Sequence, residues 1–270
     1  MGYDAYNREE RALCFHLFRL LHEKLTSNPK ESGLYKLIEK LATRKKFKDG
    51  DTGIILNELR FDNMAIYAEV ALIRDRFENL KPEKTAANQF MDGLVTLVKG
   101  QENVHECKLY SELPEILRDY KKTHPKQIKA KAEKEKTNLN PDEMKVYGAV
   151  QAMFNAKPDL AITIDNYLLV FEAKFTEKFD DAQLIRTGKI AQVWASDLLF
   201  RELGFKNAPT YTVVKLGLKE SDSDITWRDI WGIAEKMNFA ATDRSYRAFK
   251  NALNYERQEL EVGVNDYLSG

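Results

Sequence analysis

The side chains best suited to chemistry are two carboxylates and one ammonium group: Asp159, Glu172 and Lys174. Asp159 begins a run rich in strand-forming residues, PDLAITID, and the other two lie in the next run, YLLVFEAKF. The turn-prone pair Asp165-Asn166 joins the two runs, which predicts a tight β-hairpin. Because side chains alternate along a strand, Glu172 and Lys174 should point to the same face. Pairing across the hairpin then brings Asp159 beside them.

This convergence of charge favours a bound cation. Charge on an otherwise apolar strand is costly unless it is paired or coordinates a metal. Two carboxylates at one spot repel each other, whereas Mg²⁺ binds them well, with water and the Ala173 carbonyl completing an oxygen shell. A lysine beside the cation can orient or help to deprotonate the attacking water and can stabilise charge on a scissile phosphate. The simpler alternative is a surface ion pair between Glu172 and Lys174, with Asp159 as a turn residue.

The same residues match a family pattern. Pro158-Asp159 followed, thirteen positions after the aspartate, by Glu172-Ala173-Lys174 resembles the motif of the PD-(D/E)xK nuclease superfamily. The resemblance implies a restriction-endonuclease-like α-β-β-β-α-β core. It also implies that Asp159 and Glu172 bind Mg²⁺, for which Mn²⁺ can substitute, and that Lys174 is the catalytic cation.

A third carboxylate is expected from the first helix. Glu10 stands before Leu13 and Leu17 at a spacing that turns it inward, as in many members of the superfamily. The alternative is an acidic first-turn residue favoured by the helix dipole. Glu9 and Glu143 compete with Glu10 for the metal contact.

The helix expected after Lys174, DDAQLIRTGKIAQVWASDLLF, adds further candidates. Gln183 is similar to the glutamine that some relatives use to hold substrate or active-site groups, although the tyrosine of the strongest version is missing. Arg186 and Lys189 are expected phosphate contacts, or otherwise solvated helix positions.

The predicted fold class is α/β (α+β). The first core helix occupies 1–28, a mainly helical insertion 29–139 with a charged linker at 121–139, the nuclease core 140–218, and C-terminal helices 219–270. The insertion is expected to be helical at three segments: GLYKLIEKLA, AIYAEVALIRDRF and ANQFMDGLVTLV. The lysine-rich stretch 121–136 has no apolar face worth burying, so it should be a solvated helix or linker. Downstream we expect a strand at TYTVVKLGL, a helix with a Thr226/Asp229 capping box, and a helix at RSYRAFKNALNYERQELE.

Composition limits the other function classes. The chain has 42 basic and 42 acidic residues, so a polyanion site must come from local clustering. The two cysteines, Cys14 and Cys107, suit reduced thiols in a cytosol. No zinc-protease or Gly-rich phosphate-loop motif is present, although an ATPase on another chain stays open as a partner. A membrane-spanning helix needs roughly 20 apolar residues, and no apolar run in the sequence approaches this length. We therefore expect a cytoplasmic protein that does not associate with a membrane.

Two hypotheses follow. The first is an endonuclease or exonuclease that acts on DNA rather than RNA, in defence, restriction or repair, with a homodimer expected because duplex cleavage usually needs two active sites. The second is a non-catalytic interaction module that binds a protein partner on the same scaffold. Metal-dependent cleavage separates the two.

Overall fold

The computed structural model describes residues 10–44, 64–119, 123–174, 179–237 and 251 of the 270-residue chain. The chain divides into two compact units, each assembled from separate segments. Unit 1 comprises Met1–Ala68, Asp159–Leu184 and Thr212–Gly270. Unit 2 comprises Glu69–Pro158 and Ile185–Tyr211. The fold is therefore mixed, with helices and strands in one chain, as predicted.

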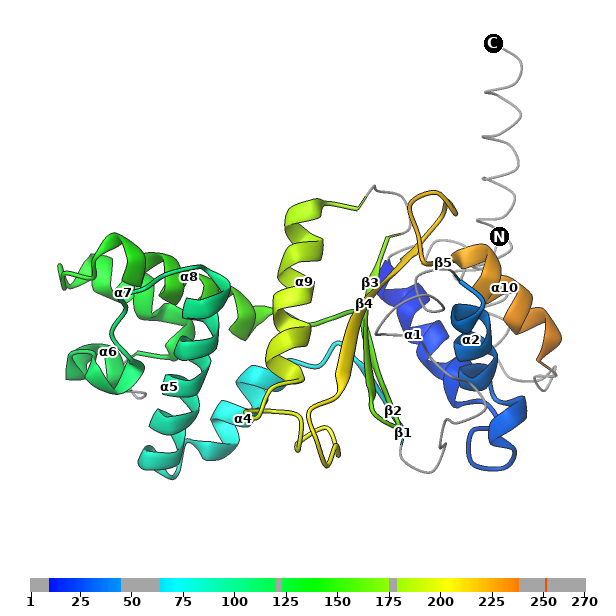
Figure 1. Ribbon diagram of the computed structural model, residues 1–270, viewed down its shortest axis with the longest axis horizontal. Coiled ribbons are helices and arrows are strands. Elements are labelled where there is room, and N and C mark those ends of the chain that lie inside the picture. Colours follow the sequence, from blue (N-terminus) through cyan, green and yellow to red (C-terminus); the bar gives the residue numbers. More distant parts are fainter. Residues whose placement is uncertain (1–9, 45–63, 120–122, 175–178, 238–250, 252–270) are drawn as a thin grey trace, which may run out of the picture. The chain divides into compact units, whose positions relative to one another are not determined.

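A five-stranded mixed sheet organises unit 1 (Figure 1). Its strands follow one another in the order of the sequence: β1 (Met64–Ala68), β2 (Leu160–Ile164), β3 (Tyr167–Ala173), β4 (Thr210–Gly217) and β5 (Ile225–Thr226). Strands β1, β2 and β3 pair antiparallel, and β4 pairs parallel with β5. The first two residues of β4 belong to unit 2.

Three helices cover one face of this sheet: α1 (Glu10–His22), α2 (Gly33–Ala42) and α10 (Trp227–Lys236) (Figure 1). Each helix turns an apolar stripe inward, as Leu13, Leu17, Leu20 and Leu21 do in α1. These stripes pack on alternate residues of the central strands, including Leu169. The hydrophobic core of unit 1 thus lies between the helices and one sheet face.

The hairpin prediction is confirmed. Strands β2 and β3 are joined by Asp165 and Asn166, and Asp165 adopts a positive φ of 50°. Asp and Asn tolerate this left-handed conformation better than most residues, and two-residue hairpin turns require it. The predicted strand at TYTVVKLGL is confirmed as β4. The Thr226/Asp229 capping box is present at the start of α10.

Unit 2 is built from helices: α4 (Leu72–Leu80), α5 (Lys84–Gln101), α6 (Glu115–Arg118), α7 (Ile128–Lys134) and α8 (Pro141–Asn155). Short 3₁₀ turns at Tyr110–Glu112 and Pro125–Gln127 separate some of these helices, and a third, Pro29–Glu31, precedes α2 in unit 1. Helix α9 (Asp181–Trp194) begins with four residues of unit 1 and continues in unit 2. The helices expected from GLYKLIEKLA and ANQFMDGLVTLV are α2 and the central part of α5.

Two expectations for the insertion are wrong. The segment AIYAEVALIRDRF is not one helix, because its first four residues belong to β1 and only Leu72 onward is helical. Ile66 and Tyr67 are good strand formers, and pairing with β2 outweighs the helical periodicity. The lysine-rich stretch is not a solvated linker in its described part: α7 buries Ile128 and Ala132, which stand one helical turn apart.

Some predictions fall outside the described residues. These are the tip of the strand after Lys174 and nearly all of the helix expected at RSYRAFKNALNYERQELE. Among the helices that the structure does describe, none combines the length and the apolar character needed to cross a bilayer.

Candidate active site

The hairpin register places Asp159 and Glu172 together. Leu160 pairs with Phe171 at the open end of the hairpin, so the next residues outward, Asp159 and Glu172, stand opposite each other. Directly opposed residues of an antiparallel pair share a face, with Cβ atoms about 5 Å apart. Oδ2 of Asp159 also accepts the backbone N–H of Ala173 at 2.8 Å, which ties the aspartate to β3. The two carboxylates therefore belong to the same end of the same hairpin.

Their sheet face is the one opposite the helical core. Leu169, Phe171 and Ala173 point into the core formed with α1, α2 and α10. Glu172 lies between two of them in sequence, so alternation turns it to the other face. The burial of Glu172 is nearly complete, with 5% of its surface exposed.

Lys174 lies directly after β3. Its Nζ stands 3.8 Å from Oε1 of Glu172, and the two side chains expose only 11% and 7% of their surfaces. The Lys174 N–H donates to the Leu216 carbonyl at 2.8 Å, which attaches this residue to β4. The ammonium group is thus held beside the carboxylate by the backbone of two strands.

Gln183, from the first turn of α9, completes the cluster. Its side-chain amide donates to Oε1 of Glu172 in a short hydrogen bond. Glu172 consequently has an ammonium group and an amide donor as neighbours. The structure brings together Asp159, Glu172, Lys174 and Gln183, all within unit 1.

Sequence reasoning did not identify Trp227 as part of this arrangement. The indole Nε1–H of Trp227 donates to the Lys174 carbonyl at 3.0 Å, and the ring is buried at the start of α10. Its hydrogen bond could not be predicted, because the partner is a backbone group 53 residues away.

Of the other candidate carboxylates, the structure describes the side chain of Glu143 but not those of Glu9 and Glu10. Glu10 is the first residue of α1, but its side chain lies outside the described residues, as does all of Glu9. Glu143 is buried in unit 2, where its carboxylate accepts the N–H of Asn140 at 2.9 Å and closes a capping box at the start of α8. Glu143 therefore has a structural role.

Both expected phosphate contacts belong to unit 2. Arg186 is exposed on α9 within unit 2. Lys189 forms an ion pair with Glu102 in the same unit. Both remain expectations as contacts to nucleic acid.

A divalent cation fits the donors that are present. Asp159 and Glu172 supply carboxylate oxygens on one face, and Mg²⁺ commonly uses one or two carboxylates and fills its remaining positions with water. In the described part of the chain, no group of three or more His, Cys, Asp or Glu side chains converges on a metal-sized site. A cation here would therefore rely on two carboxylates, a backbone carbonyl such as that of Ala173, and water.

The cysteines offer no competing nucleophile among the described residues. Cys14 is buried in the core of unit 1. Burial, reinforced by the negative charge of Glu143, raises the pKa of Cys107 to about 11. A thiol with this pKa is almost entirely protonated at neutral pH and is a poor nucleophile.

Comparison of the chain with protein-family models, with curated proteins and with solved structures finds no match. The site is therefore interpreted from its own geometry and chemistry.

Proposed function

We propose that the protein is a metal-dependent nuclease that hydrolyses phosphodiester bonds in DNA. The observation that carries the proposal is the meeting of Asp159, Glu172 and Lys174 at the open end of one hairpin. Two carboxylates with an adjacent ammonium group match the needs of phosphodiester hydrolysis, in which negative charge builds up on the phosphate oxygens.

Each residue has a distinct role. Asp159 and Glu172 would hold Mg²⁺ or Mn²⁺, which polarises the phosphate and lowers the pKa of a bound water. Lys174 orients the attacking water and stabilises the charge that develops on the scissile phosphate. Gln183 positions Glu172 through its side-chain amide.

The order of elements supports a PD-(D/E)xK core. Helix α1 is followed along the chain by α2 and then by β1, β2, β3, α9 and β4. Apart from α2, this is an α-β-β-β-α-β succession, with helices of unit 2 inserted between β1 and β2. The two motif segments stand at β2 and β3, as the superfamily pattern requires. This succession differs from the predicted position of the insertion, which was placed before all the strands.

One observation favours the alternative, a non-catalytic interaction module. Lys174 and Gln183 already neutralise and hydrogen-bond the buried Glu172 without a metal. Such a network can be purely structural, and in that case the helical unit 2 would be the surface that binds a protein partner.

A cleavage assay separates the two. Wild type, Asp159→Ala and Lys174→Ala are incubated with plasmid, linear duplex, single-stranded DNA and RNA, in Mg²⁺, Mn²⁺ or EDTA. The proposal predicts metal-dependent cleavage of DNA by wild type and a loss of at least about 100-fold in both variants. Folding of the variants is checked by circular dichroism. Cleavage by wild type that both variants retain would exclude this site as the catalytic centre.

A further inference from the structure

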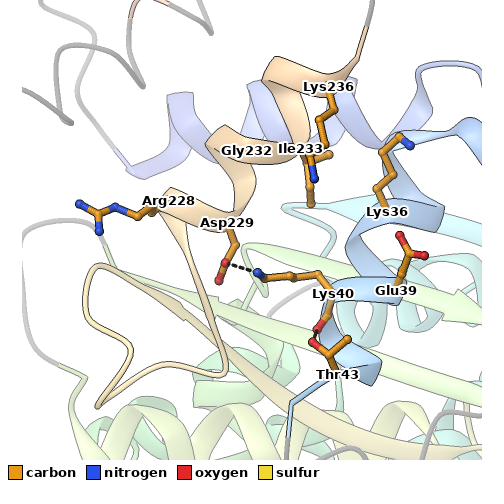
Figure 2. A pocket seen from close by; sticks show the side chains of 9 residues that line it. All are labelled: Lys36, Glu39, Lys40, Thr43, Arg228, Asp229, Gly232, Ile233 and Lys236. Atoms are coloured by element: carbon orange, nitrogen blue, oxygen red, sulfur yellow. Dashed lines mark hydrogen bonds and ion pairs between the residues drawn. The ribbon is translucent and has the colours of Figure 1, made fainter.

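A groove with an excess of positive charge lies between α2 and α10, within unit 1 (Figure 2). Its volume is about 510 Å³, within the range of ligand sites. The residues that line it are Lys36, Glu39, Lys40, Thr43, Arg228, Asp229, Gly232, Ile233 and Lys236. Four cations thus face two carboxylates.

One of the two carboxylates is already engaged. Asp229 binds Lys40 at 3.0 Å and Arg44 at 2.7 Å, and it also caps α10 through Thr226. These contacts fix Lys40 at the wall of the groove (Figure 2). The second carboxylate, Glu39, is exposed.

The other three cations of the groove have no ion-pair partner among the described residues. In the part of the chain that the structure describes, neither Lys36 nor Arg228 nor Lys236 forms a salt bridge. Lys36 and Lys236 come from different helices and both border the groove (Figure 2). Cations placed at one groove from two helices create a local positive field although the whole chain has no net charge.

The spacing of the cations favours a chain of phosphates over a single anion. Arg228 and Lys236 are eight residues apart on α10, which corresponds to about 12 Å along a helix axis. Lys36 and Lys40 are one turn apart on α2, or about 6 Å. One phosphate cannot contact charges spread over this length, whereas successive phosphates of a strand can.

The floor of the groove permits close approach. A Cβ built on Gly232 would meet nothing within 4 Å, so the backbone of α10 is open to the groove at this point. Ile233 next to it is buried, which gives the groove an apolar base beneath a charged rim.

The groove is separate from the candidate active site. Helices α2 and α10 pack on the sheet face that carries Leu169 and Phe171, whereas Glu172 belongs to the opposite face. A ligand in the groove therefore contacts different residues from those that surround a scissile phosphate.

We propose that the groove between α2 and α10 binds the phosphate backbone of a nucleic-acid strand, as a second, non-catalytic contact. The identity of the polyanion rests on the proposed nuclease function, and the existence of an extended anion site rests on the groove itself. Lys36 and Lys236 bind phosphates directly. Lys40, which Asp229 holds at the wall of the groove, adds positive charge there.

The test measures binding of fluorescein-labelled single-stranded and duplex DNA in EDTA, where no cleavage occurs. Wild type is compared with Lys36→Gln, Lys236→Gln and the double variant. The matched control is Lys30→Gln, an exposed lysine of unit 1 that does not line the groove. We expect the double variant to bind at least tenfold more weakly at low salt and the control to stay within twofold. The slope of log affinity against log salt should fall by about one for each lysine removed.

Several results would overturn the proposal: a double variant that binds like wild type, a wild type that binds no nucleic acid, or equal displacement of DNA by poly-glutamate. Displacement by millimolar inorganic phosphate at constant ionic strength would also overturn it, because this result indicates a site for one phosphate. If wild type binds through the groove but cleaves nothing with any metal, the nuclease function fails and the groove stands. If it cleaves but the groove variants bind normally, only the groove fails.

Discussion

Glu172 occupies a position that only a few side chains can hold. It is buried on an apolar strand, where Lys174 forms an ion pair with its carboxylate and the Gln183 amide donates a hydrogen bond to it. The period of two along β3 and the two-residue turn are enough to predict that Asp159, Glu172 and Lys174 meet. Trp227 could not be predicted, because its partner is a backbone carbonyl and no side-chain pattern records such a contact.

Gln183→Ala should reduce cleavage about 10-fold to 100-fold, because Glu172 loses a donor that orients it, as supporting residues of metal ligands do. The initial rate at saturating metal measures this effect. Ile185→Ala is the control, since Ile185 is 60% exposed on the same helix. An equal rate in both variants would exclude a positioning role for Gln183.

At the scale of elements, the sequence predicts a helix, cap or turn correctly where neighbouring residues determine it. It fails where pairing between distant strands determines the structure. The caps, the hairpin and the apolar stripes of α1 and α2 follow from neighbouring residues. Strand β1 was missed because its residues also fit a helical period, and only the distant β2 selects the extended form. Helix α7 was misread because two apolar side chains among many lysines are enough to anchor it.

Trp227→Phe tests how α10 supports the site. Phenylalanine keeps most of the buried ring but removes the N–H that binds the Lys174 carbonyl, so we expect a loss of about 1 kcal/mol in the free energy of unfolding. Urea unfolding measures this loss. We also expect slower cleavage under conditions where the variant is fully folded, because Lys174 is less well positioned. Reduced stability with an unchanged rate would indicate a purely structural contact.

Asp229 should make the stability of unit 1 dependent on pH. Burial raises the pKa of its carboxyl, but hydrogen bonds from Thr226, Lys40 and Arg44 outweigh burial and hold the pKa below its ordinary value. Because the folded-state pKa is lowered, the stabilisation is complete above the ordinary aspartate pKa of about 3.9 and is lost as the pH falls through the lower folded-state value.

Urea unfolding between pH 6 and the acid limit of folding tests this expectation, followed by tryptophan emission because Trp227 and Trp231 lie on α10. Asp229→Asn should show a weaker dependence on pH than wild type over the same window. Identical pH profiles would show that Asp229 does not carry the effect.

At the scale of the whole molecule, each of the two units combines segments from distant parts of the sequence. The mixed α/β class could be predicted from the alternation of strand-like and helix-like runs. The assembly of unit 1 from three separate segments could not, because it depends on β1 pairing with a strand that follows it by nearly 100 residues. The candidate active site and the groove proposed to bind a nucleic-acid strand both lie within unit 1.

The most direct test of the nuclease proposal is the initial rate of supercoiled plasmid cleavage across a Mg²⁺ titration, for wild type, Glu172→Gln and Glu143→Gln. Both variants replace a buried glutamate by its neutral counterpart, and glutamine can still close the capping box at α8. The account predicts Mg²⁺-dependent cleavage by wild type, a loss of at least about 100-fold in Glu172→Gln, and a near-normal rate in Glu143→Gln. A Glu172→Gln variant that cleaves as fast as wild type would contradict it.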